Sequence, residues 1–355
     1  MKFTFRTRTV LLILVLAAAI AAVIAALSIP YLREAAPSAS PYVPPEKNKL
    51  VVYTSHKEEV WWPVIKEFEE RTGIYVEVVE GGTNELLETL SSSKDEPVCD
   101  VMFGGGAESL NFYRDLFLPY QAQDAEHLSG QYSLSDHTWT PFSALPVVLI
   151  YNPKLVAQGQ LTSWQDLLDP QYKGRIAFAD PAVSASNFTA LATMLCACGR
   201  EEDQEEILKA FAHNLGGLLM ASSGDSLSEV ADGTCLVGIS LEETALKRID
   251  AGDNLAVVYP GDGTSAVPDG TAILLNAPHP ENAKRFLDYT ISEDVQHLMA
   301  GRFYRHSVRD DIEEGDLLPE LSRIPMVNYD MEEIGRRRES IMTEFSFFFG
   351  GEVQE

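Results

Sequence analysis

Residues 50–79 read LVVYTSHKEEVWWPVIKEFEERTGIYVEVV, and this stretch decides the fold. A β-branched run at 50–54 precedes a segment in which apolar residues, including Val64 and Phe68, recur at helical spacing. A second run of strand-forming residues follows at 74–79. The order of strand, helix and strand predicts parallel strands whose connecting helix covers one face of a sheet.

The same alternation continues toward the C-terminus. NELLETL (84–90) predicts the next helix, and DVMFGGG (100–106) predicts a third strand that ends in glycines. A second series of alternating elements begins near residue 145. Its expected strands are 146–152, 175–180, 236–240, 255–260 and 271–275. Its expected helices are 163–170, 188–197, 204–215, 241–249 and 281–291. The pattern by itself predicts two α/β units with a cleft between them.

The chain of 355 residues carries 27 basic and 53 acidic side chains, for a formal charge of −26. Its length favours two domains, and its hydrophobic content of 45% is typical of a globular protein. So acidic a chain repels phosphate backbones at long range, and we expect no nucleic-acid partner. The same repulsion acts on small anionic ligands, so an anion site must overcome it.

The N-terminal residues 1–36 differ from the rest. Lys2, Arg6 and Arg8 precede an apolar run of 18 residues, Val10–Leu27, which predicts either a cleaved signal peptide or an uncleaved membrane anchor. Both place the folded part outside the cytoplasm. Without residues 1–36 the remainder has 23 basic and 52 acidic residues, a net charge of −29.

Residues 37–48 are rich in proline, and we interpret them as a linker.

Four cysteines, Cys99, Cys196, Cys198 and Cys235, suit an oxidising compartment and allow three disulfide pairings. A bridge from Cys235 to Cys196 or Cys198 is favoured, because a bridge between the latter two would close a very tight ring. Four reduced core cysteines are the alternative. The seven histidines show no metal-ligand spacing, so we expect neither a metal site nor a cofactor.

Three junctions between a strand and the next helix are rich in small hydroxyl residues. The candidate ligand-binding residues at these junctions are Ser55, Thr83, Asn84, Ser184, Ser186 and Asn187. In open α/β sheets ligands bind at the carboxyl ends of the strands, where helix N-termini offer free N–H groups to an anion. The alternative is that Ser55, Thr83 and Ser186 only cap their own helices.

Asp225 and Glu242 follow later in the second unit. Carboxylates at these positions would accept hydrogen bonds from sugar hydroxyls or pair with an ammonium group. The alternative is that both are surface acids of a very acidic protein.

Residues 224–227 spell GDSL, a motif of hydrolases in which the serine, here Ser226, is the nucleophile. Asp294 and His297 formally supply the Asp-x-x-His of that family. Two features oppose this reading: the motif lies two thirds along the chain, and Asp294 and His297 fall in a helical pattern. A secreted hydrolase is kept as an alternative.

From Leu50 onward the chain resembles the bacterial extracellular solute-binding proteins of ABC importers, in the branch of ferric-iron, 2-aminoethylphosphonate, phosphoglycerate and hexose-phosphate binders. The blocks that carry the resemblance are VVYTSHKEE (51–59), GGTNELLETL (81–90), DVMFGGGAESL (100–110), WQDLLDPQYKGRIAFADP (164–181) and LLNAPHPENAKRFLDYTIS (274–292).

The resemblance implies an α/β, two-lobed type II periplasmic-binding-protein fold, in which each lobe is a mostly parallel sheet flanked by helices and the ligand cleft lies between the lobes. Lobe 1 would comprise 49–144 plus 271–355, and lobe 2 would comprise 145–270. The chain would cross between the lobes near 146–149 and 267–272.

Iron binders of this branch hold the metal with adjacent tyrosines, whereas the matching stretch here reads GISLEE (238–243), and no two tyrosines are adjacent anywhere. The phosphate and phosphonate binders are similar to this chain at Ser55, Thr83 and 184–187. The resemblance therefore implies a small phosphorylated or phosphonate organic ligand, with a ferric-iron binder as the alternative on the same fold.

In that role the protein would not be an enzyme. Asp225 and Glu242 would contact the non-phosphate end of the ligand, and Arg309 would add a charge to the cleft. We expect a monomer that delivers its ligand to an ABC permease or reports it to a sensor kinase.

Overall fold

The computed structural model describes residues 43–94, 98–132, 134–313 and 317–352. The predicted signal or anchor segment, 1–36, lies outside the described residues, as does the first half of the predicted linker. Among the helices of the described ranges, none combines the length and apolarity that a bilayer crossing requires.

The first elements follow the predicted order. They are β1 (Lys49–Thr54), α2 (Glu58–Thr72), β2 (Tyr75–Glu80), α3 (Thr83–Ser92), β3 (Val101–Gly106) and α4 (Ala107–Phe112). Strand β1 pairs in parallel with both β2 and β3, as the alternation predicts. Helix α2 buries Val60, Val64 and Phe68 against this sheet, because these residues share one face at helical spacing.

The later elements complete an eight-stranded mixed sheet. In chain order they are β4 (Thr140–Tyr151), β5 (Ile176–Ala177), α5 (Ala185–Cys198), α6 (Gln204–Leu215), α7 (Ser223–Ala231), β6 (Val237–Leu241), α8 (Glu242–Asp250), β7 (Ala256–Val258), β8 (Ala266–Ile273), α9 (Pro280–Thr290), α10 (Glu293–Phe303) and α11 (Met331–Glu352). The strand order is β2-β1-β3-β8-β4-β6-β5, and β7 pairs with β4.

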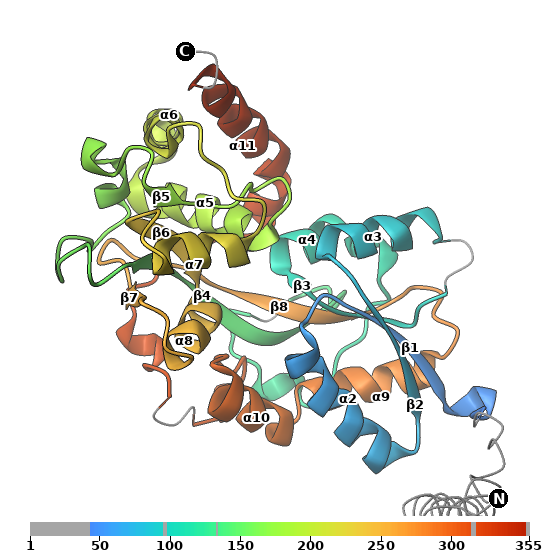
Figure 1. The fold of residues 1–355 in the computed structure, drawn as a ribbon. Helices are drawn as coiled ribbons and strands as arrows, with labels where there is room; N and C mark the ends of the chain where they lie inside the picture. The colour runs from blue at the N-terminus through green and yellow to red at the C-terminus, as the bar shows by residue number, and fades with distance from the viewer. Residues whose placement is uncertain (1–42, 95–97, 133, 314–316, 353–355) are drawn as a thin grey trace, which may run out of the picture. The chain divides into compact units, whose positions relative to one another are not determined.

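Strands β4 and β8 connect the two parts of the sheet (Figure 1). The first half of β4, Thr140–Pro146, pairs antiparallel with β8, and β8 also pairs with β3. From Val147 onward β4 pairs instead with β6 and β7. A single strand therefore changes partners at Pro146, and the residues around this point belong to both parts of the molecule.

The two largest hydrophobic cores of the described residues lie on either side of this change of partners. The first core contains Phe68, Phe103 and Phe286 around β1 and β3. The second core contains Trp164 and Phe211 around β4 and β6. Residues of α11 pack into the second core, whereas the predicted lobe boundaries assign 271–355 to lobe 1. The boundaries themselves stay a prediction.

Two predicted elements of the second unit are shorter than the sequence suggests. Only Ile176–Ala177 of the expected strand 175–180 pairs with β6. The expected helix at 163–170 forms two 3-10 turns instead, at Gln165–Leu168 and Pro170–Tyr172. Asp169 precedes a proline and is extended, which ends the first turn, and its side chain accepts from Gln171 N–H and so caps the second turn.

All four cysteines lie within the described ranges and are free thiols. Cys235 is buried beside α7, in a cluster with Leu227 and Val230. Cys196 and Cys198 pack instead against the Trp164 core at the end of α5. The favoured bridge from Cys235 is therefore wrong, because its partners belong to a different cluster of apolar side chains.

Gly270 sets the spacing between β8 and β4. A Cβ atom there would lie 2.5 Å from Trp139 Cε3 and 2.9 Å from the backbone oxygen of Thr140. We expect Gly270→Ala to lower the free energy of unfolding by about 1–3 kcal/mol, since the backbone must shift to admit the methyl group. Urea unfolding of the wild type and the variant measures this difference in the free energy of unfolding.

The matched control is Gly301→Ala on α10, where a Cβ would meet nothing within 4 Å. We expect this variant to be as stable as the wild type or slightly more stable. A Gly270→Ala protein with wild-type stability would contradict the packing described for this crossing.

Candidate ligand-binding site

A cleft of about 540 Å³ lies where the change of partners in β4 brings the two cores together. It is lined by the ends of β1 and β3, by the first turns of α2, α3, α5, α7 and α8, and by β8. The lining side chains that matter for binding are Ser55, His56, Lys57, Thr83, Ser186, Thr189, Ser222, Glu243, Asp269 and Arg305.

Four of the helices that begin at the cleft have no side-chain cap. The N-cap residues of α2, α3, α5 and α8 are Lys57, Gly82, Ser184 and Leu241, and none of them accepts a hydrogen bond from its own helix through a side chain. The uncapped first turns leave N–H groups and a partial positive charge at the cleft. This arrangement suits an anionic group.

The alternative that Ser55, Thr83 and Ser186 only cap their helices is wrong. Lys57 is the N-cap of α2, and Thr83 and Ser186 lie inside the first turns of α3 and α5. The hydroxyl groups of these three residues are therefore not used as caps.

The glycines at the end of β3 let the backbone approach these hydroxyl groups. Gly104 and Gly105 have φ values of +112° and +93°, in the region that favours glycine. A Cβ at Gly104 would lie 2.7 Å from Ser55 Oγ, and a Cβ at Gly105 would lie 3.0 Å from Thr83 Cγ2. The GGG sequence therefore brings three strand ends together around the cleft.

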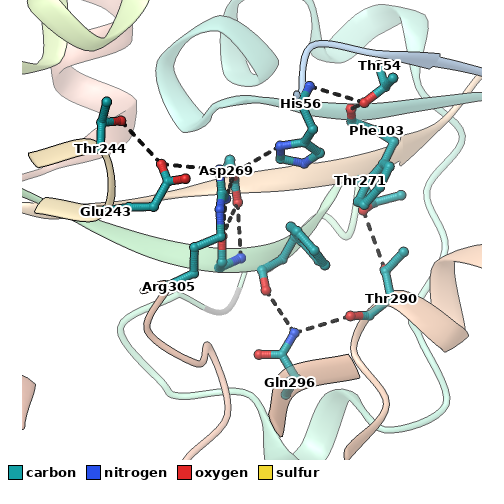
Figure 2. A network of polar contacts seen from close by, with 12 residues as sticks. Thr54, His56, Phe103, Glu243, Thr244, Asp269, Thr271, Thr290, Gln296 and Arg305 are labelled. Carbon is teal, nitrogen blue, oxygen red and sulfur yellow. Dashed lines mark hydrogen bonds and ion pairs between the residues drawn. The ribbon is translucent and has the colours of Figure 1, made fainter. Parts of the chain in front are cut away.

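The floor of the cleft is a buried ionic network (Figure 2). Arg305 Nη1 lies 2.6 Å from Asp269 Oδ2, and Arg305 Nη2 lies 3.8 Å from Glu243 Oε2. Ser143 donates to Asp269 through its backbone N–H and its hydroxyl group, at 3.0 and 2.8 Å. The network joins β4, β8, α8 and the segment after α10.

The charges of this network stabilise one another. Burial alone would raise the pKa of Glu243, but Arg305 and Lys247 outweigh burial and lower it. Burial likewise opposes the charge of Arg305, yet Asp269 and Glu243 raise its pKa. Glu243 and Arg305 are therefore both charged at neutral pH.

His56 stands beside the network, and its ring contacts those of Phe103 and Phe142. Its Nδ1 lies 3.7 Å from Asp269 Oδ2. Burial lowers the pKa of His56 to about 4, since the nearby carboxylate only partly offsets desolvation. The imidazole is therefore neutral at pH 7.

Two buried nitrogen atoms of the cleft residues, His56 Nε2 and Arg305 Nε, have no hydrogen-bond partner among the described residues. An unpaired buried polar atom costs free energy, so a polar ligand that reaches either one gains by satisfying it. Neutral His56 leaves Lys57 and Arg305 to balance Glu243 and Asp269. The cleft is therefore not acidic, although the chain as a whole is.

Of the predicted site residues, Ser55, Thr83 and Ser186 line the cleft. Ser184 lies just behind, where its hydroxyl is 3.1 Å from that of Ser186. Asn84 is half-buried and is not among the lining residues.

Four other predicted residues do not line the cleft but stabilise the surrounding structure, and they are Asn187, Asp225, Glu242 and Arg309. Asn187 accepts from the backbone of Ala179 and donates to Ser184, so it fixes the loop before α5. Asp225 accepts from the hydroxyl of Ser222, the N-cap of α7. Neither carboxamide nor carboxylate is among the lining groups.

The side chains of Glu242 and Arg309 likewise bind other residues of the protein. The Glu242 carboxylate is fully buried, lies 2.8 Å from His306 Nε2 and accepts from the hydroxyl of Tyr259. Arg309 forms a two-pronged ion pair with Asp311. Both residues are replaced at the cleft by close neighbours in the sequence, Glu243 and Arg305.

Of the lining residues that matter for binding, the sequence patterns did not predict seven, which are His56, Lys57, Thr189, Ser222, Glu243, Asp269 and Arg305. Glu243 differs from the predicted Glu242 by one helical position, which rotates a side chain by about 100°. His56, Lys57, Thr189 and Ser222 lie within two residues of a predicted position or motif, and this short distance along the chain was the only signal for them. No sequence pattern marked Asp269 or Arg305.

The structure does not assemble the hydrolase arrangement. Ser226 lies in the interior of α7 and is 0% exposed, and α7 is capped by Ser222. On α10, Asp294 pairs with Arg71, and His297 is half-exposed near Glu293. A buried serine within a helix cannot act as the exposed nucleophile that such a reaction requires.

Within the described ranges, no group of three or more His, Cys, Asp or Glu is placed to hold a metal ion. The residues that line the cleft include no tyrosine.

The pKa of His56 predicts a pH-dependent stability. The unfolded chain binds a proton at His56 near pH 6.5, whereas the folded protein binds it only near pH 4. The free energy of unfolding therefore falls between pH 6.5 and 4, by up to about 3 kcal/mol from this group. Urea unfolding of the wild type and His56→Gln should show a shallower pH dependence in the variant.

The exposed His297→Gln is the control and should retain the pH dependence of the wild type. An unchanged slope in His56→Gln would contradict the assignment of a neutral, buried imidazole.

Known proteins are similar to this chain over most of its length. The chain is 26% identical to iron uptake protein A1 of Synechocystis sp. over 279 residues, 75% of this chain and 77% of that protein. It is 25% identical to a putative 2-aminoethylphosphonate-binding periplasmic protein of Salmonella typhimurium over 272 residues, 72% of this chain and 76% of that protein.

A solved structure shows the same fold. The periplasmic binding protein AfuA from Actinobacillus pleuropneumoniae, with fructose-6-phosphate bound, superposes with a TM-score of 0.77 at 22% identity, covering 85% of this chain and 98% of AfuA. The fold is thus the α/β type II periplasmic-binding-protein fold that the resemblance implies. The family model for bacterial extracellular solute-binding proteins matches residues 96–333, and the chain belongs to this family.

Proposed function

We propose that the protein is an extracytoplasmic solute-binding protein of an ABC importer that captures a small phosphorylated or phosphonate organic anion. The observation that carries the proposal is the set of uncapped helix N-termini that open onto a single charge-balanced cleft. Such N–H groups bind an anion without lysine-rich attraction, which an acidic surface would oppose.

In the proposed complex, the phosphate or phosphonate lies between α3 and α5. The hydroxyl groups of Ser55, Thr83 and Ser186 donate to its oxygens, together with the first backbone N–H groups of both helices. One wall of the cleft supplies Ser55 and Thr83, and the other supplies Ser186. The ligand therefore binds best when both walls contact it.

The remaining end of the ligand faces Glu243 and Asp269 on the cleft floor. These carboxylates accept hydrogen bonds from sugar hydroxyls or from an amine. They replace Asp225 and Glu242 in the predicted site, because both of those side chains have internal partners. The name of the Salmonella relative, a 2-aminoethylphosphonate binder, supports a ligand with these two ends.

Binding is the whole function in this proposal, and no chemistry is done on the ligand. A ligand that contacts both walls stabilises the closed conformation, which a membrane partner can then recognise. That partner is an ABC permease, with a sensor kinase as the alternative, and the protein acts as a monomer. Residues 1–36 direct it across or into the membrane.

A ferric-iron binder is the second candidate, favoured by the name of the Synechocystis relative. The lining of the cleft favours the organic anion, because it includes no tyrosine whose oxygen could bind a ferric ion. The two candidates differ in a measurable way, since an iron site needs the metal and an anion site does not.

Thr83→Val tests the anion site. The hydroxyl of Thr83 is proposed to donate to a charged oxygen, so its loss should weaken binding about 10- to 100-fold. Melting curves with sugar phosphates, phosphoglycerates, phosphonates and Fe³⁺ first identify the ligand, because a compound that binds only the native state raises the melting temperature. Titration calorimetry then compares the variant with the wild type.

Thr89→Val is the matched control, because Thr89 lies on the same helix, is exposed and donates its hydroxyl to the backbone oxygen of Glu85. A melting shift with Fe³⁺ alone would overturn the proposed ligand class in favour of iron. Hydrolysis of a nitrophenyl ester that disappears in Ser226→Ala would overturn the binding role altogether.

A further inference from the structure

Helices α2 and α8 begin on opposite walls of the cleft. Val60 and Val64 anchor α2 in the first core, and Ala245 anchors α8 in the cluster around β4 and β6. The first turns of both helices lie at the cleft, where Lys57 precedes α2 and Glu243 belongs to α8.

An ion pair joins these two helices. Lys247 Nζ lies 2.8 Å from Glu59 Oε1 on α2 and 2.6 Å from Glu243 Oε1 on its own helix. The ammonium group is thus shared between a carboxylate that lines the cleft and a carboxylate on the opposite wall. Glu59 is half-exposed and is not among the lining residues, whereas Lys247 is largely buried.

The charges on the two walls are complementary beyond this pair. Lys57 and Glu59 lie at the start of α2, and Glu243 and Lys247 belong to α8. The charge of Lys57 helps to lower the pKa of Glu243. A cation and an anion of each helix therefore face opposite charges on the other helix.

We propose that the ion pair between Glu59 and Lys247 is a latch that holds the two cleft walls together and thereby sets how slowly the protein releases its ligand. The inference rests on the proposed function. Glu59 contacts no ligand in this arrangement and acts only through Lys247, so it is a positioning residue.

The strength of the latch follows from its exposure. Ion pairs with one exposed partner contribute little and are screened by salt. The latch therefore adjusts the rate of ligand release rather than deciding whether the ligand binds. Its effect should be largest at low ionic strength, where salt screens the two charges least.

Glu59→Gln and Glu59→Lys test the latch in the full chain, with Glu58→Gln and Glu58→Lys as matched controls. Glu58 lies in the same helical turn, is exposed and forms no ion pair within the described ranges. Each control makes the same change of net charge, so general attraction of an anion is altered equally in both members of a pair.

Stopped-flow measurements with 2-aminoethylphosphonate, and in parallel with fructose 6-phosphate, give the association and dissociation rates. We expect Glu59→Gln to release the ligand about 2- to 5-fold faster than Glu58→Gln, and Glu59→Lys to release it faster still. Association rates should match within each pair. The difference in release should vanish at 500 mM salt (about 4 Å of Debye length).

Hydrogen exchange in the ligand-free protein supplies a readout that does not depend on the ligand. Without the latch, the first turns of α2 and α8 should exchange faster in Glu59→Lys than in Glu58→Lys at low salt. If neither probe binds but this difference appears, the proposed ligand class fails and the latch stands. Equal release rates and equal exchange within each pair would overturn the latch and leave the proposed site intact.

Discussion

The buried ion pair between Asp269 and Arg305 is the interaction on which the rest of the structure depends. Asp269 lies on β8 at the point where β8 passes β4, and it also accepts two hydrogen bonds from Ser143 of β4. Breaking a buried ion pair is strongly destabilising, because one charge then remains without a partner. The pair therefore fixes the strand crossing, the segment after α10 and the cleft floor at once.

This network also explains how so acidic a protein could bind the anionic ligand that we propose. The formal charge of −26 belongs to the chain as a whole, whereas the cleft pairs Glu243 and Asp269 with Lys57 and Arg305. Uncapped helix N-termini then supply the positive potential that the side chains do not. In the proposed complex an anion is held by neutral donors inside a balanced cleft, so the acidic surface does not need to attract it.

The fold was largely predictable, since alternating strands and helices are local patterns. Helix α6 covers the predicted residues 204–215, and β1, β2 and β3 form the expected parallel sheet. The site was predictable only in part. Ser55, Thr83 and Ser186 follow from the rule that ligands bind at strand ends, whereas Asp269 and Arg305 are separated by 36 positions and meet only after β8 and α10 have packed.

The sequence by itself determined the order of the elements, the hydroxyl residues at the strand ends and the family, because each is encoded in contiguous residues. Only the tertiary structure decided which of two adjacent carboxylates, Glu242 or Glu243, faces the cleft. Glu242 is fully buried beside His306, whereas Glu243, one helical position later, lines the cleft. The direction of a side chain depends on how its helix packs, and packing is set by residues far away in the chain.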